Sequence, residues 1–265
     1  MIVRVPVLFC LLASAALPGA AELSDEACST ASTIFANGFA PGPPLGSFDM
    51  QVEVSGQGTR TFRVHAAASL MPPHRHALLI TLHGAGGPGT APAAASFMRD
   101  AWSATADAGG FLVLAPIASG AQGGWVPSLD YPALAAAIDA LQALYPVDTR
   151  RRYLHGFSAG GHVVHDLGLY NANYFAAYVA NAGVLDALAG ANAPAQALRH
   201  IPVQVRVGNS DTLLTYAQTD RNRFLAAGWS EPADYQLVVF AGGHSFDAGH
   251  TGPAWDFLCR RARLP

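Results

Sequence analysis

Lysine is absent from this 265-residue chain, whose fifteen cationic residues are all arginine. Without lysine the chain cannot form a Schiff base with a carbonyl substrate, and it cannot complete a phosphate-binding loop of the kind that ends in lysine. Charged residues of any kind are few, at 12% of the chain, and the formal net charge is −3. No basic stripe is available to follow a phosphate backbone, which argues against nucleic-acid binding.

Apolar runs long enough to cross a membrane are also missing. The longest one, residues 5–17, is shorter than the ~20 residues that a bilayer requires. It follows Arg4 and is broken by Pro18-Gly19, and small residues precede a cleavage point after Ala21. The pattern predicts a signal peptide over residues 1–21, with an uncleaved anchor as the alternative. We therefore expect a secreted or periplasmic domain over residues 22–265, without stable membrane association.

Cysteine is scarce, with three residues in the whole chain. Cys10 would leave with the signal peptide, and Cys28 and Cys259 would remain, one near each end. Their separation fits no metal-ligand spacing, and we expect no metal or other cofactor. In an oxidising compartment a pair of cysteines is more often bridged than free. We predict a disulfide that ties the N-terminal segment to the last helix, with two buried thiols as the alternative.

Hydrophobic residues make up 51% of the chain, and their pattern alternates between strand and helix types. Two alternating runs, 48–54 and 60–66, flank Ser55-Gly56-Gln57-Gly58 and predict a β-hairpin. Continuously apolar runs typical of buried parallel strands then recur at 77–82, 111–117, 153–157, 176–181, 203–207 and 236–240. Helical patterns follow the runs, clearest over 131–145, 159–170 and 212–227. The order predicts an α/β fold, a mostly parallel sheet with an N-terminal antiparallel hairpin and helices on both faces, as in α/β hydrolases.

A Gly-x-Ser-x-Gly pattern at Gly156, Ser158 and Gly160 follows one of these strands and opens a helix. In that setting the serine occupies a tight turn above the sheet edge, and the glycines let strand and helix approach closely. Ser158 is thus a candidate nucleophile. The alternative is a glycine-rich turn with a surface serine.

An oxyanion that develops during acyl transfer needs two fixed N–H donors. We expect them to be the backbone N–H groups of Ala159, which follows the nucleophile, and Ala85, in the loop Leu82-His83-Gly84-Ala85-Gly86-Gly87. His83 is interpreted as a structural residue that holds this loop by hydrogen bonds. A phosphate-binding loop is the rival interpretation, but the segment lacks the required spacing.

The acid and base that such a serine needs follow it in the chain. In this fold the order is Ser, then Asp or Glu, then His. Asp211 follows the strand at 203–207 and His244 follows the strand at 236–240, so we predict a Ser158–His244–Asp211 triad. Asp186 is the alternative acid. Asp247 and His250 are interpreted as part of a solvated loop rather than as supports of the triad.

Other noticeable residues have more ordinary interpretations. His162 and His165 have zinc-ligand spacing on a helix, yet packing beneath the site is favoured. His74, His76 and the run 150–152 are expected on the surface. Trp125 could stack on a ring of the substrate or cap the core. Residues 182–202 allow only a short cap over the site, which argues against an interfacially activated lipase.

With these residues in place, the chain from Phe48 onward resembles the secreted polyhydroxybutyrate-depolymerase and feruloyl-esterase-like (carbohydrate esterase type 1-like) branch of the α/β hydrolases. Similar stretches are the opening strand 58–64, the approach to Ser158 at 145–158, the loop 208–216 with Asp211, and the segments 242–244 and 255–258. The chain departs from many relatives in having Ala85-Gly86-Gly87 where they carry a cysteine and a glutamine.

The resemblance implies a serine esterase acting on a small-molecule or polysaccharide-linked ester, such as feruloyl, acetyl-polysaccharide or short hydroxyalkanoate esters. A serine peptidase on the same fold and a non-catalytic binding protein with a relic site are the alternatives.

Overall fold

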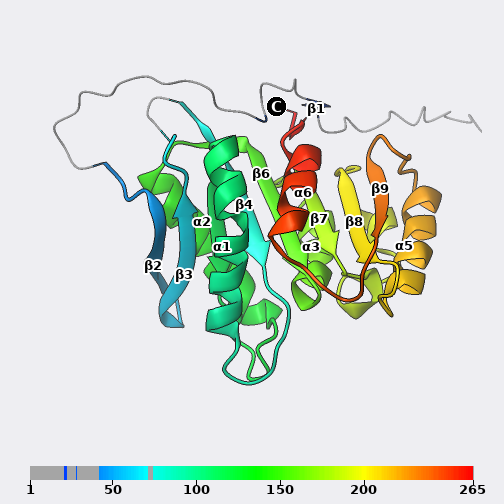
Figure 1. The fold of residues 1–265 in the computed structure, drawn as a ribbon, viewed down its shortest axis with the longest axis horizontal. Helices are drawn as coiled ribbons and strands as arrows, with labels where there is room; N and C mark the ends of the chain where they lie inside the picture. The colour runs from blue at the N-terminus through cyan, green and yellow to red at the C-terminus, as the bar shows by residue number, and fades with distance from the viewer. Residues whose placement is uncertain (1–20, 23–27, 29–41, 71–73, 265) are drawn as a thin grey trace, which may run out of the picture.

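A computed structural model describes residues 21–22, 28, 42–70 and 74–264 of the chain. Its main sheet has eight strands in the order β2-β3-β5-β4-β6-β7-β8-β9 (Figure 1). The strands are β2 Gly46–Val54, β3 Gly58–Ala66, β4 His76–Leu82, β5 Leu112–Pro116, β6 Val147–Phe157, β7 Ala177–Asn181, β8 Val203–Gly208 and β9 Tyr235–Phe240. From β5 to β9 all neighbours are parallel, whereas β3 runs antiparallel to both β2 and β5. The predicted hairpin and parallel sheet are confirmed.

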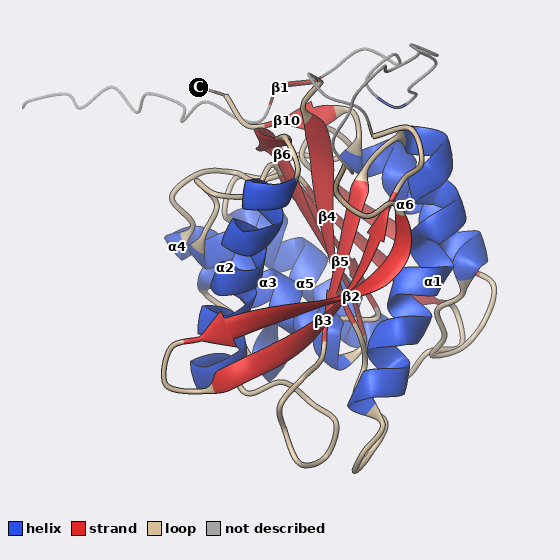
Figure 2. Ribbon diagram, turned by 90° about the vertical axis from the view of Figure 1, so that its left-hand side faces the viewer, coloured by secondary structure: helices blue, strands red, loops and turns tan. Residues whose placement is uncertain are grey.

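Helices cover both faces of this sheet, as Figure 2 shows. One face carries α1 (Ala91–Gly109) and α6 (Thr251–Leu258), whose apolar side chains form one core cluster with the sheet. The other face carries α2 (Pro127–Leu144), α3 (Ala159–Tyr170) and α5 (Leu214–Ala226), which share the larger cluster. The three helical ranges predicted from periodicity are confirmed, although α2 begins four residues earlier than expected. This arrangement is the α/β-hydrolase fold.

The segment between β7 and β8, residues 182–202, forms only a short cap. It holds a 3-10 turn, η2 (Leu185–Ala187), and a one-turn helix, α4 (Ala193–Gln196). A second 3-10 turn, η3 (Ala248–His250), lies directly before α6. No large helical cap is built from residues 182–202, as the sequence predicts.

Strand β6 is longer than predicted, and this corrects one surface assignment. The apolar pattern indicated a strand from Tyr153, but β6 starts at Val147 and contains all three consecutive arginines. Arg150 is exposed as expected. Arg152 is not: it is 8% exposed, and its guanidinium lies 4.1 Å from the centre of the Tyr174 ring. The strand carries this side chain under the ring, where a cation–π contact compensates for lost hydration.

The expectation for His76 is also wrong. His74 is exposed, but His76 begins β4 and is only 5% exposed. Its backbone N–H donates to the carbonyl oxygen of Pro146, 2.8 Å away. Pairing with the chain at the start of β6 therefore draws this histidine into the edge of the core.

Cys28 and Cys259 form a disulfide, with their Cα atoms 5.1 Å apart. Cys259 caps α6, so the bond joins the N-terminal segment to the last helix. Nearby, β1 (Ala21–Glu22) pairs with β10 (Arg261–Ala262). Apart from Ala21, the predicted signal peptide lies outside the described residues. Within the described ranges, no helix has the length and apolarity that a membrane crossing demands.

Candidate active site

The carboxyl ends of the parallel strands bring the predicted triad to one edge of the sheet. Ser158 directly follows β6, Asp211 lies three residues past β8, and His244 lies four residues past β9. Because these strands are parallel, their carboxyl ends meet at the same edge, where open α/β sheets bind ligands. Three side chains that are far apart in sequence therefore converge at one place.

The three side chains form a continuous hydrogen-bonded chain. His244 Nε2 lies 2.9 Å from Ser158 Oγ, and His244 Nδ1 lies 2.8 Å from Asp211 Oδ2. A carboxylate can only accept, so Nδ1 carries the proton and Nε2 is left to accept from the serine hydroxyl. The His244 side chain is 40% exposed while that of Asp211 is fully shielded. The imidazole is thus open to a reactant on one side and fixed by a buried carboxylate on the other.

Ser158 occupies a strained backbone conformation, with φ +53° and ψ −116°. Few residues other than glycine adopt a positive φ, and strain of this kind is concentrated at functional sites. The turn is tight because its flanking residues lack side chains. A Cβ on Gly156 would lie 2.2 Å from the carbonyl oxygen of Gly160, and a Cβ on Gly160 would lie 2.2 Å from that of Leu82. Any side chain at position 156 or 160 would therefore collide with the backbone, which explains the two glycines of the Gly-x-Ser-x-Gly pattern.

The two residues expected to supply oxyanion donors belong to segments that border Ser158. Ala159 is the first residue of α3, where helix geometry leaves N–H groups without intrahelical partners. Ala85 is in the loop after β4. The preceding residue, Gly84, is so close to the serine that an added Cβ would lie 3.1 Å from Ser158 Cβ. The loop after β4 and the start of α3 therefore both lie beside the nucleophile.

His83 holds the loop after β4, as the sequence interpretation proposed. Its side chain is buried; Nδ1 donates to the Gly84 carbonyl at 2.9 Å, and Nε2 accepts from the Ala118 N–H at 3.2 Å. This pair of bonds specifies the neutral ring, and burial lowers the pKa of His83. Trp125 adds a second tie, because its indole N–H donates to the His83 carbonyl at 2.9 Å. Trp125 is half-buried against the core.

The loop that carries Trp125 is anchored by a carboxylate that sequence reasoning missed. Asp130, 3% exposed, accepts hydrogen bonds from the N–H groups of Ser119 and Val126, at 3.3 and 2.7 Å. Its other oxygen pairs with Arg60 of β3 at 3.2 Å. An aspartate in the first turn of a helix is ordinary in sequence, so no pattern distinguished it.

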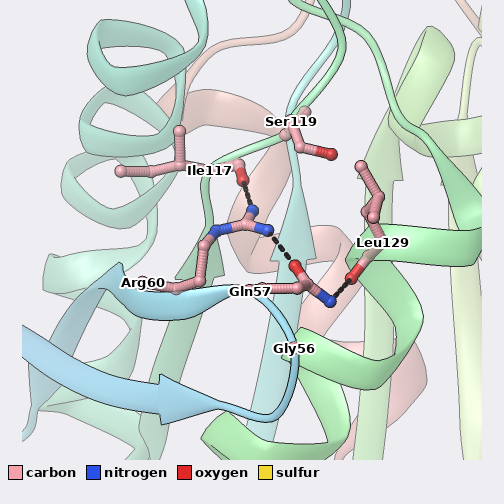
Figure 3. Close-up of a pocket in the computed structure, with 7 residues that line it drawn as sticks. Gly56, Gln57, Arg60, Ile117, Ser119 and Leu129 are labelled. Atoms are coloured by element: carbon pink, nitrogen blue, oxygen red, sulfur yellow. Dashed lines mark hydrogen bonds between the residues drawn. The ribbon is translucent and has the colours of Figure 1, made fainter.

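Arg60 also borders a shallow pocket of about 430 Å³ beside this loop (Figure 3). Its guanidinium donates to the Ile117 carbonyl at 3.0 Å and to the Gln57 side chain at 2.8 Å. Gln57 in turn donates to the Leu129 carbonyl at 3.0 Å. The hairpin turn, the end of β5 and the start of α2 are thus joined by one polar network, which fixes the loop next to the site.

Asn181 is a second residue that the sequence did not reveal. It ends β7 and is completely buried. Its carbonyl oxygen accepts the N–H of Ser158 at 2.9 Å, and its side-chain amide donates to the carbonyl of Ser245 at 3.1 Å. One residue therefore fixes both the turn that bears the nucleophile and the loop that bears His244. A lone asparagine at a strand end gives no recognisable motif, so only the fold exposes this role.

The histidines on α3 have partners within the protein. His162 Nδ1 accepts the Val184 N–H at 2.9 Å, and burial lowers the pKa of His162. His165 is fully buried, with Nδ1 3.0 Å from the Tyr178 hydroxyl, and burial lowers its pKa to about 3. Among the residues with described positions, no group of three or more histidine, cysteine or acidic side chains is arranged to hold a metal.

The remaining acidic candidates lie in other interactions. Asp186 is half exposed and pairs with Arg223 at 2.9 Å, whereas Asp211 bonds His244. Asp247 is 72% exposed and caps η3 by accepting the N–H of Gly249 at 2.8 Å. The interpretation of Asp247 as part of a solvated loop is confirmed. The same interpretation is wrong for His250, whose side chain is only 14% exposed and whose ring packs against Phe240 and Phe246.

Comparison with known proteins supports the fold at low sequence identity. No protein-family model matches the chain, and no curated protein matches it. Among solved structures, a thermostable esterase superposes with a TM-score of 0.63 at 18% identity, over 82% of this chain and 63% of its own. A ferulic acid esterase gives 0.62 at 17%, over 80% and 96%. Dipeptidyl peptidase 4 from Porphyromonas gingivalis gives 0.61 at 15%, over 82% and 35%, so this chain spans about a third of that protein.

Proposed function

We propose that the protein is a serine esterase that cleaves carboxylic esters through an acyl-enzyme. The observation that carries the proposal is the unbroken hydrogen-bonded chain from Ser158 through His244 to the buried Asp211. Such a constellation is recognised by its geometry and roles rather than by overall sequence similarity. A strained turn at the nucleophile and free N–H groups at the start of a helix accompany it, as acyl transfer requires.

The reaction follows from the proton positions. Ser158 Oγ attacks the ester carbonyl carbon as its proton moves to His244 Nε2, and Asp211 stabilises the imidazolium. The N–H groups of Ala159 and Ala85 stabilise the oxyanion, each contributing a factor of about 10²–10³ in kcat. The alcohol leaves with the proton from His244, which gives the acyl-enzyme. His244 then deprotonates a water molecule that attacks the acyl carbonyl, and the acid is released as Ser158 regains its proton.

The proposal extends to the substrate of the enzyme, the residue that contacts it and the location of the protein. The sequence resemblance to polyhydroxybutyrate depolymerases and feruloyl esterases suggests feruloyl, acetyl-polysaccharide or short hydroxyalkanoate esters as substrates. Similarity to a ferulic acid esterase over 96% of that protein's length supports the first of these. Trp125, half-buried beside the loop of Ala85, is proposed to contact the substrate. The apolar N-terminal segment and the disulfide support a secreted or periplasmic location.

Peptide hydrolysis is the second candidate, because dipeptidyl peptidase 4 shares the fold. A panel of matched substrates separates the two activities: p-nitrophenyl butyrate for the ester, and p-nitroanilides of alanine and of Ala-Pro for the amides. We expect hydrolysis of the ester and little of the anilides. Faster cleavage of an anilide would make the protein a peptidase.

The role of Ser158 is tested on the same panel. Ser158→Ala should reduce ester hydrolysis by at least ~10³-fold, because the nucleophile is lost while only binding and oxyanion contacts remain. Ser128→Ala, at an exposed serine in the first turn of α2, is the matched control and should retain full activity. If Ser158→Ala were as active as the control, this site would not catalyse the reaction. If neither protein turned over any substrate, a binding protein with a relic site would be the better description.

A further inference from the structure

A row of aromatic side chains leads from the candidate base to the protein surface. The Phe157 ring is centred 5.1 Å from the His244 imidazole, tilted by 39°. Phe246 lies 6.1 Å beyond it, with the two phenyl rings 28° from parallel. Phe97 of α1 then meets Phe246 edge-on, at 6.4 Å and 87°. We refer to Phe157, Phe246 and Phe97 as the aromatic row.

The two ends of the aromatic row are more exposed than its middle ring. Phe246 is 7% exposed and Phe157 is half-buried, whereas 51% of Phe97 faces solvent. The buried stripe of α1, which includes Ala95, Met98 and Trp102, packs on the sheet without Phe97. The fold therefore does not need a phenyl ring at position 97. An exposed apolar side chain that ring contacts connect to a polar reaction site is suited to form part of a ligand-binding wall.

The row is fixed in place by the same contacts that hold the catalytic groups. Phe157 directly precedes Ser158, and a Cβ added to Gly84 would lie 3.2 Å from the Phe157 ring. Phe246 comes two residues after His244, on the loop held by the Asn181 amide. The rings are thus set relative to the nucleophile before any substrate arrives, which lowers the entropic cost of binding.

We propose that the aromatic row binds the apolar part of the ester, so that the enzyme prefers substrates whose acyl or alcohol portion is at least the size of a phenyl ring or a five-carbon chain. Phenylalanine offers a flat apolar surface with no hydrogen-bonding group, so the row selects for apolar area, and rings can stack or meet it edge-on. The inference rests on the proposed esterase function and adds a substrate class to it.

Two substrate series test the proposal and separate the acyl from the alcohol side. p-Nitrophenyl acetate and hexanoate differ in the acyl chain, while methyl and benzyl acetate, which both release a primary alcohol, differ in the size of the alcohol. For wild type we expect the larger member to be preferred in at least one series. In Phe97→Ala the ratio of kcat/KM, large over small, should fall about tenfold in that series through a higher KM, and Phe97→Trp should restore it. Leu144→Ala, at an exposed leucine on the opposite face, should keep both ratios at the wild-type value.

Each result has a distinct meaning. A reduced ratio in one series supports the proposal and identifies which part of the ester the row binds. Unchanged ratios in both series, with Ser158-dependent ester hydrolysis intact, would overturn the aromatic row while leaving the esterase function in place. Unchanged ratios together with altered sedimentation of Phe97→Ala would identify the patch as a contact between protein copies instead. If wild type hydrolysed no ester, the substrate assignment would fall with the proposed function.

Discussion

His244 Nδ1 lies 2.8 Å from Asp211 Oδ2, and the Asp211 side chain is fully shielded from solvent. The second carboxylate oxygen, Oδ1, accepts the backbone N–H of Leu213 at 2.9 Å. With one oxygen tied to the backbone, the other can only face the imidazole. This arrangement sets the ring orientation and keeps the proton on Nδ1, so that Nε2 is free to accept the proton of Ser158.

Replacement of Asp211 by asparagine should remove the charge while preserving the shape. Asparagine can still accept the Leu213 N–H, but an amide that donates to the imidazole would favour the wrong tautomer. We expect kcat for ester hydrolysis to fall by about 10³–10⁴-fold, with the melting temperature close to wild type. Steady-state kinetics and thermal unfolding of the same preparation measure both effects. An active Asp211→Asn variant would remove the aspartate from the mechanism, and Asp186→Asn, whose carboxylate pairs with Arg223, serves as the matched control.

The positive φ of Ser158 predicts that the backbone conformation needed for activity lowers the stability of the protein. Two inactive variants isolate the backbone effect, because Ser158→Ala retains a Cβ in the strained conformation and Ser158→Gly does not. We expect the glycine variant to be more stable than the alanine variant by about 1 kcal/mol, since relief of strain outweighs the larger entropy of unfolded glycine. Urea unfolding monitored by tryptophan fluorescence measures the difference. An alanine variant at least as stable as the glycine variant would show that the turn is unstrained.

Most of the fold could be predicted because its signals are local. Apolar runs flanked by turns locate the strands, and a hairpin with glycines in its turn is recognisable in isolation. The start of β6 was missed because Asp148 to Arg152 are polar, and an apolar criterion excludes them. Pairing with the neighbouring β4 nevertheless extends the strand, and Arg152 is buried under Tyr174 as a consequence. Tertiary contacts override local pattern at such positions.

The residues of the site also differ in whether a local sequence pattern reveals them. Ser158 is marked by flanking glycines, and Asp211 and His244 are marked by their positions after strands. Asn181 and Asp130 carry no mark, because their importance depends on backbone groups that only the folded chain brings to them. Side chains that bind main-chain atoms of distant segments are the part of a site that sequence patterns leave unseen.

Asn181 should affect catalysis without touching the substrate. Asn181→Ala removes the amide that holds the Ser245 carbonyl, so the His244 loop gains freedom. Loss of alignment between base and nucleophile is expected to lower kcat by about 10–100-fold while KM changes little. The rate of Ser158 modification by a fluorophosphonate should fall in parallel. Asn192→Ala, at an exposed asparagine, is the matched control. A variant with normal kcat but reduced stability would assign Asn181 a purely structural role.

Two fully buried histidines should make stability depend on pH. Burial lowers the pKa of His155 and of His165 to about 3. In the unfolded chain both should titrate near 6.5, so between those values the unfolded state binds more protons than the folded state. The stabilisation is complete above pH 6.5 and is lost as the pH falls toward 3. Well below pH 6.5 we expect each histidine to contribute about 1.4 kcal/mol per pH unit to the slope.

The free energy of unfolding, measured with urea between pH 5 and pH 7, checks this dependence. Carboxylates also titrate at the acidic end, so the informative quantity is the difference in slope between wild type and a variant. His165→Phe cannot take up a proton and should show a shallower dependence, whatever its absolute stability. Identical slopes would indicate that the folded protein accommodates a charged His165.

Covalent trapping tests the central claim most directly. A biotin-tagged fluorophosphonate should add one label per molecule to wild type, and peptide mass spectrometry should locate it on Ser158. His244→Ala should label at least ~100-fold more slowly, because the serine loses its general base, and Ser158→Ala should not label. Stoichiometric label on Ser158 with this dependence on His244 is the result the account predicts. Label on another residue, or none on a folded wild-type protein, would contradict it.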